Sequence, residues 1–300
     1  MRISTTMMQN LAVNAMMERQ AELSKTQQQL ATGRRILSPS QDPSGSTQIL
    51  RLEQEVALTD QYQRNSERAL SRLETEEGVL AGVGNALQRV RELAVQGLND
   101  TNSQSNRAAL AAEVRQRLDE ILQLANTKDG SGEYLFSGFR GSTEPFADAG
   151  GGNYVYQGDR GQRQIQISPT RQMASSDSGF EVFANVPYSG GGSQDMFKTV
   201  YDLAVSLEAD APSGDALTDI DAALDSIFTT RASVGGRINA IESQRDINEQ
   251  YSVQLAGELS DVQDLDYAEA VGRLNLQLAG LQASQASFQR VQSLSLFNYM

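Results

Sequence analysis

The chain has 300 residues, with 25 Lys and Arg against 38 Asp and Glu, a formal net charge of −13, and no Cys, His or Trp. A length beyond the ~100–200 residues of one domain predicts more than one core. The acidic balance disfavours nucleic acid as a partner, because binding to a phosphate backbone needs clustered Lys and Arg. The missing residue types exclude disulfides, thiol chemistry, Cys/His metal sites and Ser-His or Cys-His catalysis.

Insertion into a membrane is not expected either. No stretch approaches the ~18 consecutive apolar residues of a membrane span. Residues 1–17 are interrupted by Ser, Thr, Gln and Asn, so they lack the ~7–15-residue apolar segment of a signal peptide. We therefore expect a soluble chain that would leave the cell by another route.

The first 130 residues are predicted to be helical. Four apolar residues spaced seven apart form one edge of a heptad seam, and they are Met16, Leu23, Leu30 and Leu37. The polar stretch 38–46, SPSQDPSGS, then interrupts the pattern. Within it, Asp42 and Pro43 are the residue types favoured at the N-cap and the first position of a helix, so a second helix is predicted to start there.

This second helix is predicted to run to about Asn99, and a third to follow it as far as Ala125. Gly78, Gly82 and Gly84 lie inside the second helix and predict a kink or a close helix crossing. A nucleotide-binding loop is a poorer interpretation of these glycines, because they follow no strand and no Lys-Ser/Thr comes after them.

The composition changes at Gly130, and residues up to Gly192 are rich in Gly, Tyr, Phe and Ser. The alternating runs NYVYQ and RQIQI predict strands, and Gly158–Gly161 between them predicts a hairpin turn. The runs LFSGF and EVF are further candidate strands. In DGSGE, residues 129–133, only the outer two positions hold carboxylates, so a solvated turn is the better interpretation than a calcium loop.

Helical periodicity resumes at Met196, and the strongest heptad seam runs from Leu217 to Val262. Asp266 followed by Glu269 resembles a capping box that starts the last helix. The apolar stripe of that helix comprises Tyr267, Val271, Leu274, Leu278, Leu281 and Phe288.

The sequence thus predicts a mainly α fold of long, coiled-coil-like helices, with paired N- and C-terminal helices and an inserted β-rich domain. The expected domains are residues 1–40 with 263–300, 41–130 with 193–262, and 131–192. The apolar stripes of the two terminal segments are too sparse to offset an ordering cost of ~1–2 kcal/mol per residue. We therefore expect them to be completed by other subunits on assembly.

The expected subunit interface consists of apolar residues from both terminal segments. They are Met16, Leu23, Leu30, Leu37, Tyr267, Val271, Leu274, Leu278, Leu281, Phe288, Leu294 and Leu296. No catalytic, cofactor-binding or metal-binding residue is predicted.

Several segments resemble one family. QLATGRRILSPSQDPSGS at 29–46 resembles the N-terminal region shared by flagellin and its relatives. ANTKDGSGEYLFSGFRGSTEPF at 125–146, GQRQIQISPTRQMASSDSGFEVF at 161–183 and the ending DLDYAEAVGRLNLQLAGLQASQASFQRVQSLSLFNYM at 264–300 are similar to the hook–filament junction family of bacterial flagella, a flagellin-like group.

The resemblance implies a non-enzymatic structural protein of the extracellular flagellum. It implies a ring of copies placed between a hook-side junction protein and the flagellin filament, with the paired terminal helices lining the central channel. It also implies export of the unfolded chain through the flagellar type III apparatus, aided by a cytoplasmic chaperone that holds the C-terminal helix.

Three alternatives remain open from the sequence. A short flagellin would polymerise into long filaments, although the ending SLSLFNYM differs from that of typical flagellins. A secreted coiled-coil effector or adhesin would bind a ligand through its β insert, and its deletion would leave motility intact. A carboxylate-based enzyme would need paired acids, which the sequence does not single out.

Overall fold

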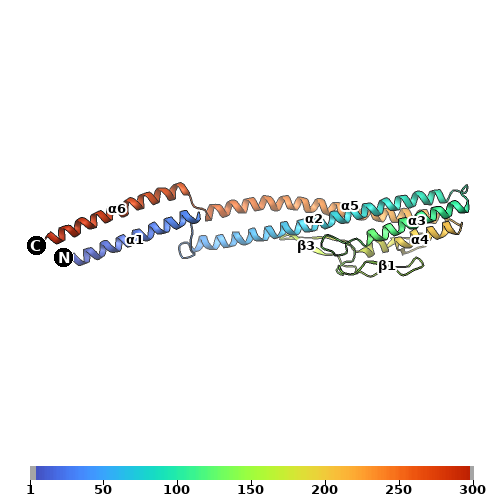
Figure 1. The fold of residues 1–300 in the computed structure, drawn as a ribbon, viewed down its shortest axis with the longest axis horizontal. Helices are drawn as coiled ribbons and strands as arrows, with labels where there is room; N and C mark the ends of the chain where they lie inside the picture. Colours follow the sequence, from blue (N-terminus) through green and yellow to red (C-terminus); the bar gives the residue numbers. More distant parts are fainter. Residues whose placement is uncertain (1–4, 298–300) are drawn as a thin grey trace. The chain divides into compact units, whose positions relative to one another are not determined.

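The structure is a computed structural model that describes residues 5–297, and long helices dominate it (Figure 1). The helices of the described range are α1 (Thr5–Thr32), α2 (Pro43–Gly97), α3 (Gln104–Ala125), α4 (Met196–Glu208), α5 (Asp215–Gln263) and α6 (Tyr267–Phe297). All the strands lie between α3 and α4. The predicted class, mainly α with long paired terminal helices and a small β insert, is confirmed.

The chain divides into two compact units. The first unit comprises Met1–Leu58 and Tyr251–Met300, and the second comprises Thr59–Gln250. The second unit holds the β insert together with the C-terminal part of α2, the N-terminal part of α5 and the whole of α3 and α4. The finer boundaries expected at residues 131 and 192, between a helical body and a β-rich domain, stay a prediction.

One hydrophobic core fills the second unit. Apolar residues at heptad-like spacing on its helices are fully buried, among them Leu73, Leu80, Leu87, Val114, Ile121, Leu203, Ile227 and Ile241. Gly82 allows α3 to approach α2, because a Cβ at this position would lie 3.1 Å from Leu124 Cδ1. The predicted close crossing is therefore present, and α2 passes through the three glycines without interruption.

Aromatic rings join the β insert to this core. Phe146 lies at the centre of the cluster, with its ring centroid 4.8 Å from that of Phe197 on α4 and 5.6 Å from that of Phe183. Phe136 packs edge-on against Phe183 with the centroids 5.1 Å apart. The insert therefore folds onto the helices through burial of its aromatic residues.

The strands form three antiparallel pairs. β1 (Phe146–Asp148) pairs with β2 (Tyr154–Tyr156), β3 (Gln164–Ser168) with β4 (Arg171–Ala174), and β5 (Val186–Pro187) with β6 (Ser193–Gln194). The predicted hairpin with its turn at Gly158–Gly161 is wrong, because the strands on either side of that turn pair with other partners.

Side-chain hydrogen bonds explain why this turn is not a hairpin. The Tyr156 hydroxyl donates to the Phe136 carbonyl (2.9 Å), and the Asp159 carboxylate accepts from the backbone N–H of Phe139 (3.0 Å) and Gly161 (2.7 Å). These bonds join the turn to residues 136–139, which form turns because Gly138 has φ +68°. LFSGF is therefore no strand.

The second expected extra strand is also wrong. EVF lies in a single π-helical turn, η1 (Phe180–Ala184), in which Val182 and Phe183 are buried. A strand would place successive side chains on opposite faces, whereas here two consecutive apolar side chains both reach the core.

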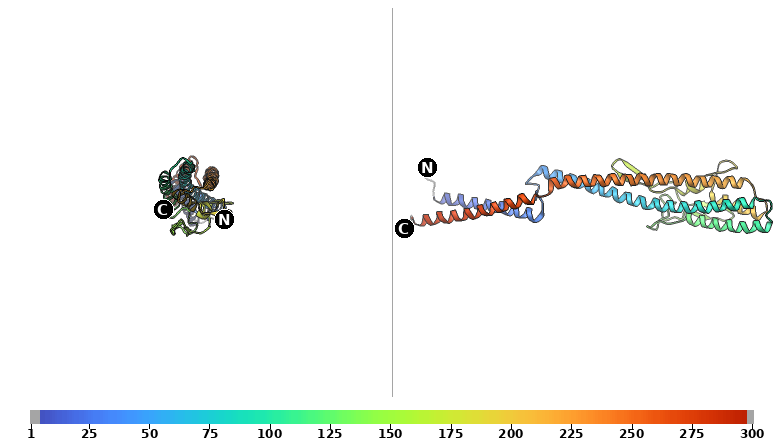
Figure 2. Two further views of the ribbon diagram at one scale, coloured as in Figure 1. Left: turned by 90° about the vertical axis from the view of Figure 1, so that its right-hand side faces the viewer. Right: turned by 90° about the horizontal axis from the view of Figure 1, so that it is seen from above.

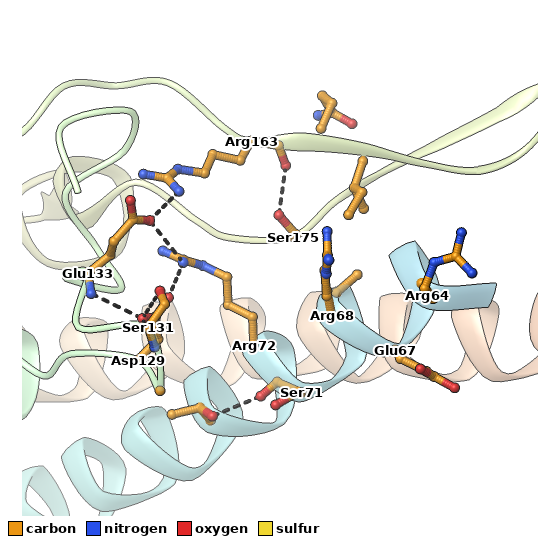
Figure 3. A pocket seen from close by; sticks show the side chains of 15 residues that line it. Arg64, Glu67, Arg68, Ser71, Arg72, Asp129, Ser131, Glu133, Arg163 and Ser175 are labelled. Carbon is orange, nitrogen blue, oxygen red and sulfur yellow. Dashed lines mark hydrogen bonds and ion pairs between the residues drawn. The ribbon is translucent and has the colours of Figure 1, made fainter. Parts of the chain in front are cut away.

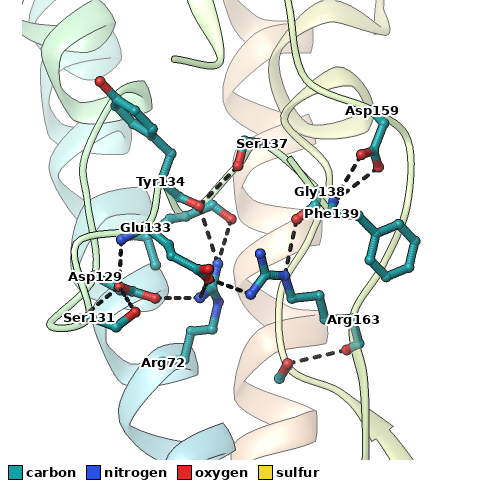
Figure 4. A network of polar contacts seen from close by, with 12 residues as sticks. Arg72, Asp129, Ser131, Glu133, Tyr134, Ser137, Gly138, Phe139, Asp159 and Arg163 are labelled. Carbon is teal, nitrogen blue, oxygen red and sulfur yellow. Dashed lines mark hydrogen bonds and ion pairs between the residues drawn. The ribbon is translucent and has the colours of Figure 1, made fainter. Parts of the chain in front are cut away.

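The DGSGE segment is a turn, as predicted (Figure 4). The Asp129 carboxylate accepts from Ser131 N (2.8 Å) and Glu133 N (3.1 Å), and it forms an ion pair with Arg72 of α2. The Glu133 carboxylate pairs with Arg163. Arginine thus occupies the carboxylates that calcium would need, and no cluster of potential metal ligands occurs among residues 5–297.

The hydropathy of the helices bears on membrane insertion. Across the part of the chain that the structure describes, no helix combines the length and apolar character required to cross a bilayer.

Candidate assembly interface

The first unit is built around the two terminal helices, α1 and α6, which run side by side in both views (Figures 1 and 2). Their facing surfaces form a narrow seam. Ala270 at the start of α6 is fully buried, and Leu23 of α1 is 8% exposed. The prediction that the two ends of the chain pair with each other is therefore confirmed for the residues described.

Seven of the predicted interface residues lie within this intramolecular seam. Leu23 is buried, and the half-buried members are Met16, Leu30, Leu274, Leu278, Leu281 and Phe288. A pair of helices shields each side chain on one side only, so these residues keep surface that further subunits could cover.

Two predicted residues lie outside the seam. Tyr267 is 56% exposed and Val271 is 46% exposed. Ala270 and half-buried Gln277 take positions nearer the partner helix, so the buried stripe of α6 is displaced from the apolar stripe of the sequence. Small and polar residues can occupy the seam between two helices. The larger apolar residues Tyr267 and Val271 are then available for other contacts.

Three further predicted residues have other placements. Leu37 is not part of a heptad, because α1 ends at Thr32, and this residue lies half-buried in the connection to α2. Leu294 and Leu296 lie in the last turns of α6, and their side chains are outside the described residues.

The structure also exposes apolar side chains that the heptad pattern missed. On α1 the most exposed are Met7 (58% exposed), Leu11 (58%) and Met17 (58%), and on α6 the most exposed is Leu276 (76%). We call these four residues, with Tyr267 and Val271, the outer apolar residues. In the sequence these residues appear only as apolar residues outside the main heptad stripe. The observed packing is needed to tell them apart from residues of the seam.

A clamp of backbone hydrogen bonds holds the connections next to the terminal helices. Arg35 N donates to Gln263 O (2.8 Å), and Leu265 N donates to Gly33 O (2.9 Å). The Arg35 guanidinium also donates to Val262 O through Nη2 (2.8 Å), so it caps the carbonyl end of α5. Together these contacts join the exit of α1 to the entry of α6.

The helices that begin at these connections have the predicted N-caps. Asp42 Oδ1 accepts from Gly45 N (2.9 Å), and α2 starts at Pro43. The Gly45 N–H and then the Ser44 hydroxyl lower the pKa of Asp42. Asp266 Oδ1 accepts from Glu269 N (3.1 Å), but Glu269 pairs with Arg273 (3.2 Å) and does not complete the capping box.

The clamp predicts a specific glycine requirement. Gly33 has φ +69°, and a Cβ there would lie 2.8 Å from the Tyr267 hydroxyl. We expect Gly33→Ala to destabilise the first unit by about 1–2 kcal/mol, the cost of a left-handed L-residue, measured by faster hydrogen exchange at Leu265. Gly272→Ala on α6 is the matched control, because its Cβ meets nothing within 4 Å. Equal exchange in the two variants would contradict the prediction.

Comparisons with known proteins agree with this architecture. Residues 3–140 match the family model of the bacterial flagellin N-terminal helical region, and residues 217–300 match that of the C-terminal helical region. The crystal structure of a flagellar hook-associated protein-3 from Legionella pneumophila is similar in fold, with a TM-score of 0.67 and 22% identity over 71% of this chain and 98% of that chain.

Comparison with two curated relatives shows whether the chain is more similar to a junction protein or to a filament subunit. The chain is 30% identical to flagellar hook-associated protein 3 of Escherichia coli, over 99% of both chains. It is 35% identical to phase 1 flagellin of Salmonella naestved, but over only 45% of this chain and 27% of that protein. The chain therefore belongs to the flagellar hook-associated protein 3 family, the hook–filament junction members of the flagellin group, and is a structural component of the extracellular flagellum and not an enzyme.

Proposed function

We propose that copies of this chain form a ring at the hook–filament junction by burying the outer apolar residues of α1 and α6 against neighbouring subunits. The observation that supports this most directly is the exposure of Met7, Leu11, Met17 and Leu276, each more than half accessible on a helix that already has its intramolecular partner. Apolar side chains at this density on paired helices are typical of surfaces that become buried on assembly.

Burial of these residues would stabilise the ring. Each Å² of apolar surface removed from water contributes about 25 cal/mol, so several large side chains per subunit would contribute several kcal/mol before ordering costs. Half-buried seam residues such as Leu274 and Leu281 would gain further contacts, so α1 and α6 would become fully ordered as neighbours arrive. The same helices would then contact the hook-side junction protein on one face of the ring and flagellin on the other.

We further propose that a cytoplasmic export chaperone covers α6 before secretion. The chaperone would shield Tyr267, Val271 and Leu276, which are exposed in the folded chain. A chain without cysteines also forms no disulfide that would oppose threading through a type III apparatus.

Charge placed on the outer face of α6 tests the proposal. We expect Leu276→Asp to reduce the amount of this protein in isolated flagella at least tenfold, because a buried unpaired carboxylate would oppose subunit contact. The adjacent Asn275→Asp is the matched control, since it adds the same charge at another exposed position of the same helix. Antibody labelling of the hook–filament boundary measures the result.

The folded state of the variant must be verified separately. Leu276 is 76% exposed, so its replacement should leave the circular dichroism spectrum and the unfolding midpoint of the isolated chain unchanged. If Leu276→Asp labels the boundary as strongly as Asn275→Asp, the outer apolar residues are not the assembly surface.

A further inference from the structure

A row of arginines follows one face of α2 in the second unit. Arg64, Arg68 and Arg72 are spaced four residues apart and line an open cavity of about 830 Å³ beside the start of β3 (Figure 3). Arg72 is neutralised by Asp129 and by Glu133 (3.8 Å). Arg64 and Arg68 are exposed and make no ion pair with any residue in the described range. Like charges four residues apart on a helix repel each other. Of the three arginines, Arg72 alone has an ion-pair partner among the described residues, and Glu67 lines the same cavity.

A complementary acidic row lies on α5 of the same unit. Glu242, Asp246 and Glu249 are exposed and share one helix face at spacings of four and three residues. The described part of the chain provides no ion pair for any of them. These like charges at neighbouring helical positions repel each other, and half-buried Arg245 lies three residues from Glu242 and four from Glu249.

Two asparagines place the rows at the same level of the unit. Asn65, next to Arg64, donates its Nδ2 to Gln166 O (2.8 Å), and Asn248, next to Glu249, donates its Nδ2 to Ile167 O (3.0 Å). Adjacent residues of β3 thus anchor both helices. The basic and acidic rows therefore lie at the same level of one compact unit.

We propose that the arginine row of one copy binds the acidic row of the next copy around the ring. A head-to-tail contact of this kind uses two different surfaces of the same chain, and it closes into a ring when both surfaces lie at the same level. The inference rests on the proposed ring assembly and adds to it a second contact, which is electrostatic and lies outside the terminal helices.

The internal contacts of Arg72 show that carboxylates can bind this row. Asp129 and Glu133 approach Arg72 from the turn at residues 129–133, and Arg163 shares Glu133 (Figure 3). Arg68, one turn earlier, offers the same guanidinium chemistry at the mouth of the cavity. Arginine pairs with carboxylates in a fork geometry, which would set the register of neighbouring copies as well as attract them.

A charge swap tests the contact in the flagellum. In a strain that expresses the full chain in place of its own junction protein, we expect Arg68→Glu or Asp246→Arg alone to lower incorporation into isolated flagella at least fivefold. The double variant, which exchanges the two charges, should restore incorporation to near the unmodified level. Arg171→Glu is the control, because Arg171 is an exposed arginine of the same unit outside the row.

Cross-linking reports the contact directly, since the chain contains no cysteine of its own. Arg68→Cys combined with Asp246→Cys should give chain-to-chain ladders with a short bis-maleimide in assembled flagella, and only monomer in dilute solution. Arg171→Cys with Asp246→Cys should give no ladder.

The outcomes separate this inference from the proposed ring. If the unmodified chain labels the junction while Arg68→Glu incorporates as well as Arg171→Glu, the electrostatic contact is overturned and the ring stands. The same conclusion follows if the double exchange fails to restore incorporation, or if Arg68→Cys with Asp246→Cys gives no ladder in assembled flagella. Absence of the unmodified chain from the junction overturns the proposed function itself.

Discussion

Replacing Arg237 by Ala is expected to reduce the free energy of unfolding of the second unit by about 3–5 kcal/mol, the usual cost of removing one partner from a buried ion pair. Arg237 of α5 forms an ion pair with Asp177, and each side chain is only 12% exposed. Arg237 also donates to Ala174 O (3.3 Å), so it holds the segment after β4 against the helices.

The loss is large because of what remains after Arg237 is removed. Asp177 would keep a hydrogen bond from Gln162 Nε2 (2.8 Å) but lose its compensating charge. Glu76 of α2, which accepts from Asp177 N (3.2 Å), is a second carboxyl beside it and is 1% exposed. Two carboxyl groups would then be buried side by side without the cation that compensates their charge.

Urea unfolding of the full chain measures this loss. Arg91→Ala is the matched control, because Arg91 pairs with Asp221 at the surface, where both side chains are about half exposed. Such pairs contribute roughly 0–1 kcal/mol. A loss for Arg237→Ala no larger than that for Arg91→Ala would show that the pair does not hold the insert in place.

Glu76→Gln is expected to remove a pH dependence from the stability of the second unit. Burial first, and then the charge of Asp177, raise the pKa of Glu76 to about 8, although Arg237 opposes this shift. The folded chain therefore keeps a proton that the unfolded chain releases above its ordinary pKa of 4.5. A protonated Glu76 can donate a hydrogen bond to the Asp177 carboxylate. An ionised Glu76 has no proton to donate.

The sign of the effect follows from proton binding. Between pH 4.5 and about 8 the folded state binds more protons at Glu76 than the unfolded state, so the free energy of unfolding falls as pH rises and becomes level above that range. Each pKa unit corresponds to about 1.4 kcal/mol, so the total fall is on the order of 5 kcal/mol. Glutamine is neutral throughout and should lack this fall.

Unfolding of both proteins at pH 5 and pH 9 provides the measurement. The difference between Glu76→Gln and the unmodified chain cancels the other titrating groups, and it should move in favour of Glu76→Gln by several kcal/mol at pH 9. Asp177 and Arg237 are the charged groups that face Glu76, and both are retained in the Glu76→Gln variant. A difference that is constant with pH would mean that Glu76 is ionised in the folded chain.

The helices and their starts were predictable because their causes are local. The heptads of α2 and α5 repeat along one stretch of chain, and Asp42 and Asp266 cap helices within a few residues of themselves. The class of fold and the family could both be obtained in this way. The turn at DGSGE was also predictable, since Asp129 bonds to residues two and four positions away.

Strand pairing and seam register depend instead on residues distant in sequence. Gly158–Gly161 has the composition of a hairpin turn, yet Asp159 and Tyr156 bond to residues 136–139, and these contacts outweigh the local preference. Likewise, the spacing of Tyr267 and Val271 matches a heptad, but the packing of α1 selects Ala270 and Gln277 for the seam.

The amino-acid sequence by itself therefore determined the helical class, the inserted β region, the helix caps and the flagellin-like family, because periodicity and capping act over a few residues. Only the tertiary structure decided which apolar residues are buried within the chain, which strands pair, and that Glu76, Asp177 and Arg237 meet. Those outcomes depend on contacts between segments distant in sequence, such as the 60 residues between Asp177 and Arg237 and the 101 between Glu76 and Asp177, and no local pattern records them.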